Sequence, residues 1–191
     1  MANILVTSIT KSFNRYANAI GGTAILNLAS PKYTELKPLF DAQYVPEVHT
    51  DDAETIKRNS RNYLARSAKL NSNASAVVEY LHSWAQDLNS SVSQVYYPSV
   101  NPSTDNYRRF MHPKTSDFAP RYGYVFSIEL NDLETARVFY NNLNVHKSAT
   151  QFGLKLMQIQ ISVGLEDIGT LVEDFQVAVE AADKAKNTAS E

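Results

Sequence analysis

The sequence of this chain begins with residue types that can perform carbonyl chemistry. The segment "SITK" places two hydroxyl side chains and a lysine at the end of a short, mostly apolar run. A lysine amine at a strand end can lose its proton and form a Schiff base with an aldehyde. The hydroxyls of Ser8 and Thr10 can donate hydrogen bonds to a phosphate group. The residue types leave a second interpretation open, in which Lys11 is an ordinary solvated lysine at the end of a strand.

Composition and charge exclude several other kinds of chemistry. The chain has no cysteine, which excludes disulfides, thiolate catalysis and thiolate metal sites. Its 4 histidines are far apart and show no metal-ligand spacing. The formal net charge is -2 with scattered Lys and Arg, which favours neither nucleic acid nor a membrane surface as partner. No apolar run could cross a bilayer, and "MANILVTSITK" lacks signal-peptide features, so we expect a cytoplasmic protein.

Hydrophobic patterns predict the elements that position Lys11. The runs "NILVTSI" and "TAILNL" are typical of buried strands, joined by a polar loop that ends in Gly21 and Gly22. Two such strands indicate the interior of an α/β sheet. The segment "SPKYTELKPLF" predicts a short helix with Pro31 in its first turn and its length limited by Pro38.

The remaining sequence predicts a long helix followed by a small sheet domain. Apolar residues recur at helical spacing from Asp51 to Ala85, with a kink or break expected near Asn71 because "KLNSNAS" contains poor helix formers. From about Val92 the runs "VSQVYYP", "YVFSIEL" and "LMQIQISVG" predict strands. A polar loop separates the first two strands, and one amphipathic helix follows the second strand and another the third. The first of these helices begins with a capping-box-like pair, Asn131 and Glu134. This order predicts a small antiparallel sheet covered by helices.

These segments resemble the cysteine and methionine metabolism enzymes that use pyridoxal phosphate, such as cystathionine γ-synthase, the cystathionine lyases and the O-acylhomoserine sulfhydrylases. "SITK" followed by "AIGGTAILN" resembles the lysine segment of that family, and "NSRNYLARSAKLNSNASAVVEYL" resembles its long linking helix. "QVYYPSV", "GYVFSIEL" and "QISVGLEDIGTLVEDFQVAV" resemble its strands and its small C-terminal domain. The resemblance covers nearly the whole chain, and "NSRNYLAR" is most similar to fungal-type relatives.

The resemblance implies an α/β fold, the C-terminal part of a fold-type I pyridoxal-phosphate-dependent transferase. Residues 1–50 would be a remnant of the large cofactor-binding α/β domain, residues 51–87 the linking helix, and residues 88–191 a shortened C-terminal α+β domain.

The resemblance also implies site residues, a substrate class and partners. Lys11 would be the Schiff-base lysine, and Ser8 and Thr10 would contact the phosphate of pyridoxal 5'-phosphate. The implied reaction is γ-replacement, in which O-acylhomoserine and cysteine give cystathionine, while β- or γ-elimination stays open. The partners implied are an amino-acid substrate and either further copies of the chain or a full-length homologue.

Four departures from the family pattern favour an alternative, a non-catalytic remnant or a subunit-associating fragment without cofactor chemistry. Only ten residues precede Lys11, so we expect a truncated chain that binds the cofactor weakly. Arg15 stands where the family usually has Gly, and Ala17 where it often has His, so Arg15 would occupy a backbone position that suits Gly. Gln160 stands at the position of the Arg that grips the substrate carboxylate, which predicts impaired substrate binding.

The fourth departure is an internal deletion. Only residues 149–157 separate Ser148 from "QIQIS", where the family has a substrate-facing segment and another helix. His146 and Lys147 then have no role that the resemblance assigns, and we expect a solvated strand end there.

Overall fold

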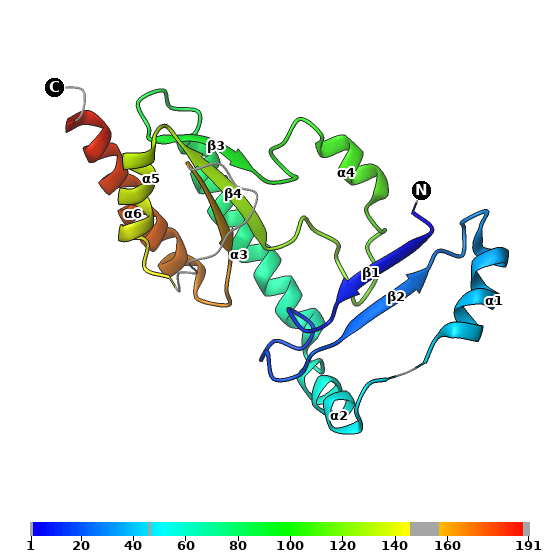
Figure 1. The fold of residues 1–191 in the computed structure, drawn as a ribbon. Helices are drawn as coiled ribbons and strands as arrows, with labels where there is room; N and C mark the ends of the chain where they lie inside the picture. Colours follow the sequence, from blue (N-terminus) through cyan, green and yellow to red (C-terminus); the bar gives the residue numbers. More distant parts are fainter. Residues whose placement is uncertain (1, 46, 146–156, 189–191) are drawn as a thin grey trace. The chain divides into compact units, whose positions relative to one another are not determined.

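The computed structural model describes residues 2–45, 47–145 and 157–188, and the chain forms two compact units (Figure 1). The first unit comprises residues 1–65 and the second residues 66–191. Lys11 therefore belongs to the first unit and Gln160 to the second. The predicted deletion and His146 and Lys147 lie outside the described residues.

The first unit begins with a two-stranded antiparallel ribbon. Strand β1 (Ile4–Ser8) pairs with β2 (Gly22–Leu26), and Ser8 lies opposite Gly22. Both predicted strands are confirmed, but their predicted burial is not, because Leu5 is 57% and Val6 73% exposed. A two-stranded sheet has no central strand, so apolar residues of the ribbon remain in contact with water.

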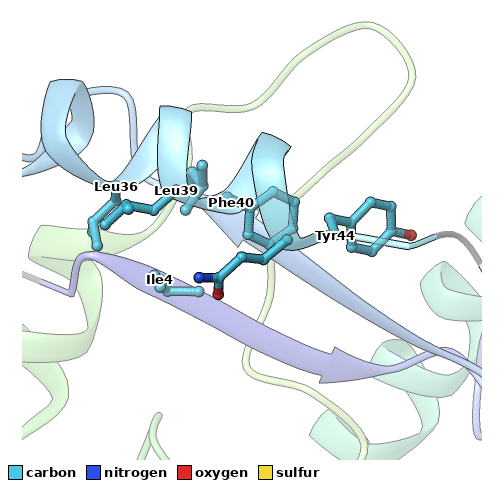
Figure 2. Close-up of a pocket in the computed structure, with 7 residues that line it drawn as sticks. Ile4, Leu36, Leu39, Phe40 and Tyr44 are labelled. Carbon is cyan, nitrogen blue, oxygen red and sulfur yellow. The ribbon is translucent and has the colours of Figure 1, made fainter.

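Helix α1 (Tyr33–Gln43) runs through Pro38, so the predicted stop at this residue is wrong. Proline lacks only one amide hydrogen, and the helix continues for five residues beyond it. Leucine and aromatic side chains of α1 face the ribbon (Figure 2). They form an apolar groove of about 340 Å³ that is lined by Ile4, Leu26, Leu36, Leu39, Phe40, Gln43 and Tyr44.

The predicted long helix is present as two helices, α2 (Thr50–Asn59) and α3 (Tyr63–Trp84). The break lies at residues 60–62 and not near Asn71, where α3 is continuous. Tertiary hydrogen bonds compensate for the low helix propensity there, since Oδ1 of Asn71 accepts from the Gly123 N–H at 2.8 Å. The two units do not correspond one to one with the predicted division into a domain remnant, a linking helix and a small domain. That division stays a proposal.

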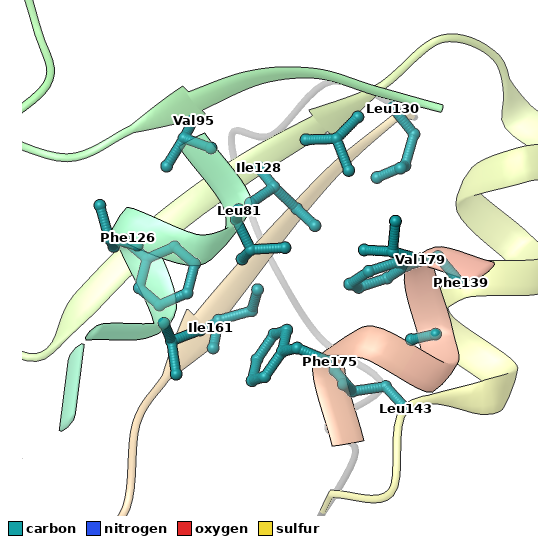
Figure 3. Close-up of a cluster of buried hydrophobic side chains, with 14 of the residues drawn as sticks. Leu81, Val95, Phe126, Ile128, Leu130, Phe139, Leu143, Ile161, Phe175 and Val179 are labelled. Carbon is teal, nitrogen blue, oxygen red and sulfur yellow. The ribbon is translucent and has the colours of Figure 1, made fainter. Parts of the chain in front are cut away.

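The second unit contains the antiparallel sheet and the helices that the sequence predicts from about Val92 onward. Strands β3 (Val92–Tyr96), β4 (Val125–Leu130) and β5 (Gln158–Ser162) form an antiparallel sheet in the order β3-β4-β5. Helices α5 (Leu133–Asn142) and α6 (Ile168–Thr188) lie side by side in Figure 1. A single core joins α3, the sheet and both helices (Figure 3), and its labelled members include Leu81, Phe126, Ile128, Phe139, Phe175 and Val179.

Two local features of this unit differ from the prediction. The capping box of α5 uses Asp132 and Thr135 rather than Asn131 and Glu134, because the side chain of Asn131 donates to the Ser90 carbonyl instead. The long polar loop contains a short helix, α4 (Thr104–Phe110), which its composition did not predict.

A lysine near the end of α6 attaches this helix to the turn between α3 and β3. Nζ of Lys186 donates to the carbonyl oxygens of Leu88 and Asn89, each at 3.1 Å, and of Ser90 at 2.7 Å. The ammonium group thereby satisfies backbone carbonyls in this turn.

Candidate functional site

The loop that carries Lys11 joins β1 to β2. Thr10, near its start, is hydrogen-bonded to Gly21, near its end. Oγ1 of Thr10 accepts from the Gly21 N–H at 2.9 Å and donates to the Gly21 carbonyl at 3.2 Å. A Cβ atom at Gly21 would lie 2.9 Å from the side chain of Ile9, so glycine permits this close approach. The hydroxyl hydrogen of Thr10 is therefore directed at the loop itself and would have to leave Gly21 to donate to a phosphate.

Lys11 and Ser8 present groups that are available to a ligand. Lys11 is exposed, and its carbonyl accepts from the Arg15 N–H at 2.7 Å, which turns the chain directly after the lysine. Within the described residues, neither the Lys11 amine nor the Ser8 hydroxyl has a hydrogen-bond or ionic partner. An amine can react with an aldehyde, and a hydroxyl can donate a hydrogen bond to an oxyanion.

The loop contains two residues in the left-handed backbone region. Arg15 has a φ of 75° and Ala17 a φ of 52°. Outside glycine, this region costs about 1–2 kcal/mol per residue. Arg15 thus occupies the kind of backbone that suits glycine, as the family pattern predicted. Its guanidinium lies 5.0 Å from the ring centroid of Tyr16, a cation–π contact.

Buried asparagines connect this loop to the end of α2, and the sequence analysis did not identify them. Nδ2 of Asn59 donates to Oδ1 of Asn14 at 2.8 Å and to Oδ1 of Asn18 at 3.0 Å. Nδ2 of Asn14 donates to the Ala19 carbonyl at 3.1 Å. A buried amide network of this kind orders the loop, because each unpaired member would be costly. The only signal in the sequence was the unusual density of Asn in two polar segments.

Gln160 lies on β5, opposite Ser127 of β4. The inner face of β4 carries Phe126 and Ile128, which are buried, so alternation places Ser127 on the outer face of the sheet. Gln160 is exposed there, and its side chain carries a neutral amide. The lysine segment and Gln160 therefore come from different units of the chain.

The described part of the chain lacks metal-binding clusters and membrane-spanning helices. No group of three or more acidic or histidine side chains in it could hold a metal ion. None of its helices has the length and hydropathy needed to span a membrane.

Comparison with known sequences identifies relatives over almost the whole chain. No protein-family model matches. The chain is 30% identical over 195 residues to the cystathionine γ-synthase-like protein ankD of Aspergillus thermomutatus, with 90% of this chain and 33% of that protein covered. It is 30% identical over 207 residues to cystathionine γ-synthase of Neurospora crassa, with 96% and 32% covered. A relative from Aspergillus violaceofuscus, 29% identical over 95% of this chain and 36% of its own length, is named an alanine racemase.

Solved structures with the same fold extend this comparison. Cystathionine γ-synthase from Xanthomonas oryzae pv. oryzae, in complex with aminoacrylate and cysteine, gives a TM-score of 0.72 at 19% identity, over 96% of this chain and 51% of that one. An O-acetylhomoserine (thiol)-lyase from Campylobacter jejuni, which carries a pyridoxyl-lysine phosphate, gives 0.67 at 18% identity, over 94% and 52%. The predicted fold is thereby confirmed as that of the fold-type I pyridoxal-phosphate enzymes. The chain spans about a third of the length of the curated relatives it matches.

Proposed function

From the relationship of this chain to the cystathionine γ-synthase-like proteins, which extends over almost its whole length, we propose that it is part of a pyridoxal-phosphate-dependent enzyme of trans-sulfuration. The observation that carries the proposal is the position of Lys11, an exposed amine three residues after the end of β1 that has no hydrogen-bond or ionic partner among the described residues. The reaction proposed is γ-replacement, in which the sulfur of cysteine bonds to Cγ of O-acylhomoserine and the acyl group leaves as a carboxylate.

The residues around Lys11 fit the cofactor. Lys11 Nζ would hold its aldehyde carbon, and Ser8 Oγ would donate to its phosphate, while Thr10 keeps the neck of the loop closed. When bound, pyridoxal phosphate acts as an electron sink for negative charge at the substrate carbons. The amine of Lys11 is also the group in this loop that can accept a proton from a substrate and return it.

The proposed site offers a weaker group for the substrate carboxylate than an arginine would. Gln160 offers one neutral amide, whereas an arginine at the same position would offer a charged bidentate fork to the α-carboxylate. We therefore expect this chain to bind amino acids less tightly than relatives that carry arginine at this position. Gln160 affects the binding of the substrate carboxylate and does not distinguish replacement from elimination or racemisation. An assay for each product makes that distinction.

Association with other subunits is the second part of the proposal. The ribbon exposes apolar side chains of both strands, including Val6 at 73% and Ile25 at 52%. Exposed apolar strands with unpaired edges favour association. We expect the chain to elute from a size-exclusion column as an oligomer, or to bind a full-length homologue added to it. A stable monomer that binds no added homologue would contradict this part.

Reductive labelling tests the role of Lys11. Pyridoxal phosphate is mixed with the chain and reduced with borohydride, and the modified lysines are mapped by mass spectrometry. We expect labelling to concentrate at Lys11, to fall at least tenfold in Lys11→Arg, and to persist in Lys32→Arg, another exposed lysine of the first unit. Labelling spread evenly over surface lysines would favour the rival function, a fragment that associates with other subunits without cofactor chemistry.

A further inference from the structure

The first unit contains a second polar site. It is formed by residues of the β1–β2 loop that follow Lys11 in sequence and by residues at the end of α2. It is an open pocket of about 620 Å³ lined by Tyr16, Asn18, Arg58, Asn59, Arg61 and Asn62, here called the arginine pocket. We infer that the arginine pocket binds a small organic anion through a phosphate or carboxylate group. Lys11 does not line the pocket, so this site is separate from the proposed cofactor position.

The charge of the pocket favours an anion. Among the described residues that line it, Arg58 and Arg61 alone are charged, although the whole chain carries a formal charge of -2. Planar guanidinium groups bind the oxygens of phosphate and carboxylate with paired hydrogen bonds. Two of them at one pocket, with no carboxylate in its lining, provide a local excess of donors that an anion would satisfy.

Neither arginine is committed to a partner in the described part of the chain. Nη2 of Arg58 lies 3.5 Å from Oγ1 of Thr55, which is too long for a strong hydrogen bond. Glu54 stands one helical turn before Arg58. Even so, the ion pairs of the described residues do not include one between this carboxylate and the Arg58 guanidinium. Arg61 has no hydrogen bond or ion pair among the described residues. Both side chains can therefore turn to a ligand without breaking an existing ion pair.

The walls of the pocket are held in place by the buried asparagines. Asn59 in the pocket donates to Asn14 and to Asn18, and Asn14 is itself fully buried. These bonds join the loop to the end of α2, so the two sides of the pocket keep their spacing. A preordered pocket loses less conformational entropy when it binds a ligand.

The loop wall also carries the backbone strain noted above. Tyr16 lines the pocket between Arg15 and Ala17, the two residues of this loop that have positive φ. Strained residues cluster at ligand sites, where the surrounding structure holds them in place. The volume of the pocket exceeds that of one phosphate, so we assign to the ligand an organic body that lies beside the Tyr16 ring.

Equilibrium dialysis of the full chain tests this inference with two probes, inorganic phosphate and malonate. We expect saturable binding of at least one, and the stronger probe identifies the headgroup as phosphate or carboxylate. The double substitution Arg58→Gln and Arg61→Gln should weaken binding about tenfold or more, since each charge-assisted hydrogen bond contributes strongly. The matched control Arg109→Gln and Arg121→Gln, which removes two exposed arginines from the second unit, should leave binding unchanged.

Hydrogen exchange with and without the bound probe locates the anion. We expect added protection in residues 16–18 and 58–62. Protection confined to residues 8–11 would place the anion at the lysine segment and overturn the inference. Absence of saturable binding by both probes, or equal weakening in the control variant, would overturn it as well.

Discussion

Thr10 and Gly21 form a reciprocal pair, in which one hydroxyl both receives the glycine N–H and donates to the glycine carbonyl. This pair closes the loop that presents Lys11. The substitution Thr10→Val keeps the shape of the side chain and removes both bonds, so we expect a local loss of about 1 kcal/mol. Hydrogen exchange at the Gly21 amide should become about fivefold faster, as that free energy implies. Thr10→Ser should retain protection, and Thr7→Val, on the exposed ribbon, should not change it.

The left-handed backbone at Ala17 gives a second prediction. Ala17→Gly removes a Cβ atom from a residue with a φ of 52°, so it should raise the free energy of unfolding of the first unit. Relief of the backbone strain should raise the free energy of unfolding by about 1 kcal/mol. The greater freedom of glycine in the unfolded chain should offset part of this gain. Ala24→Gly, in the regular strand β2, should instead lower stability. Urea denaturation followed by a probe of the first unit distinguishes the two, and equal losses would contradict the strain.

Asn73 supports a third prediction, which concerns the segment after β5. Its Nδ2 donates to the carbonyls of Gly164 at 3.0 Å and Glu166 at 2.9 Å, and the side chain is fully buried. Asn73→Ala leaves both carbonyls without this donor and should cost about 2 kcal/mol. The neighbouring exposed Ser72→Ala should be neutral or slightly stabilising, since alanine favours helix. Thermal denaturation of both variants gives the comparison, and a neutral Asn73→Ala would refute the argument.

Asn71 and Asn73 show what the sequence pattern could and could not predict. Spacing of apolar residues was sufficient for the sheet of the second unit and for α6, because those patterns reflect burial directly. In the ribbon the same kind of pattern predicted the two strands but not their exposure. The segment "KLNSNAS" suggested a broken helix, since propensity counts each Asn and Ser as a local cost. In the folded chain Asn71 and Asn73 bond to residues that are distant in sequence, and this compensation has no local signature.

The arginine pocket illustrates the same limit at a site. The family resemblance pointed to Lys11 and Gln160 by aligned motifs. Arg58 and Asn18 lie 40 positions apart in sequence, and only the fold brings them to one pocket. The φ of Arg15 could be anticipated, because a glycine in related sequences marks a backbone requirement.

Tyr97 gives a prediction about alkaline pH. Burial raises the pKa of its phenol above the usual value of 10.0, and its hydroxyl donates to the Gly123 carbonyl at 2.7 Å. The folded state therefore retains this proton at a pH where the unfolded chain loses it, so stability falls as pH rises past about 10. Tyr97→Phe should cost about 1 kcal/mol at pH 7.

The cost of Tyr97→Phe should shrink above pH 10, because phenylalanine has no proton to lose. Unfolding measured from pH 7 to pH 11 gives the two curves, with the exposed Tyr44→Phe as control. Parallel curves for the wild type and Tyr97→Phe would contradict the assignment.

The bonds of Lys186 have a consequence for how the chain responds to acylating reagents. Its nitrogen is occupied by three carbonyls, so attack on an anhydride or thioester requires α6 to release the turn first. Lys184, which is exposed two residues earlier, carries no such requirement. Acetylation should therefore be slower at Lys186 than at Lys184, as mass-spectrometric time courses would measure, and equal rates would contradict this view. Once acetylated, Lys186 has a single N–H and no charge, so at most one of its three bonds would remain and Asp183, which accepts from the Ser91 N–H at 2.6 Å, would be left to hold α6 to the turn.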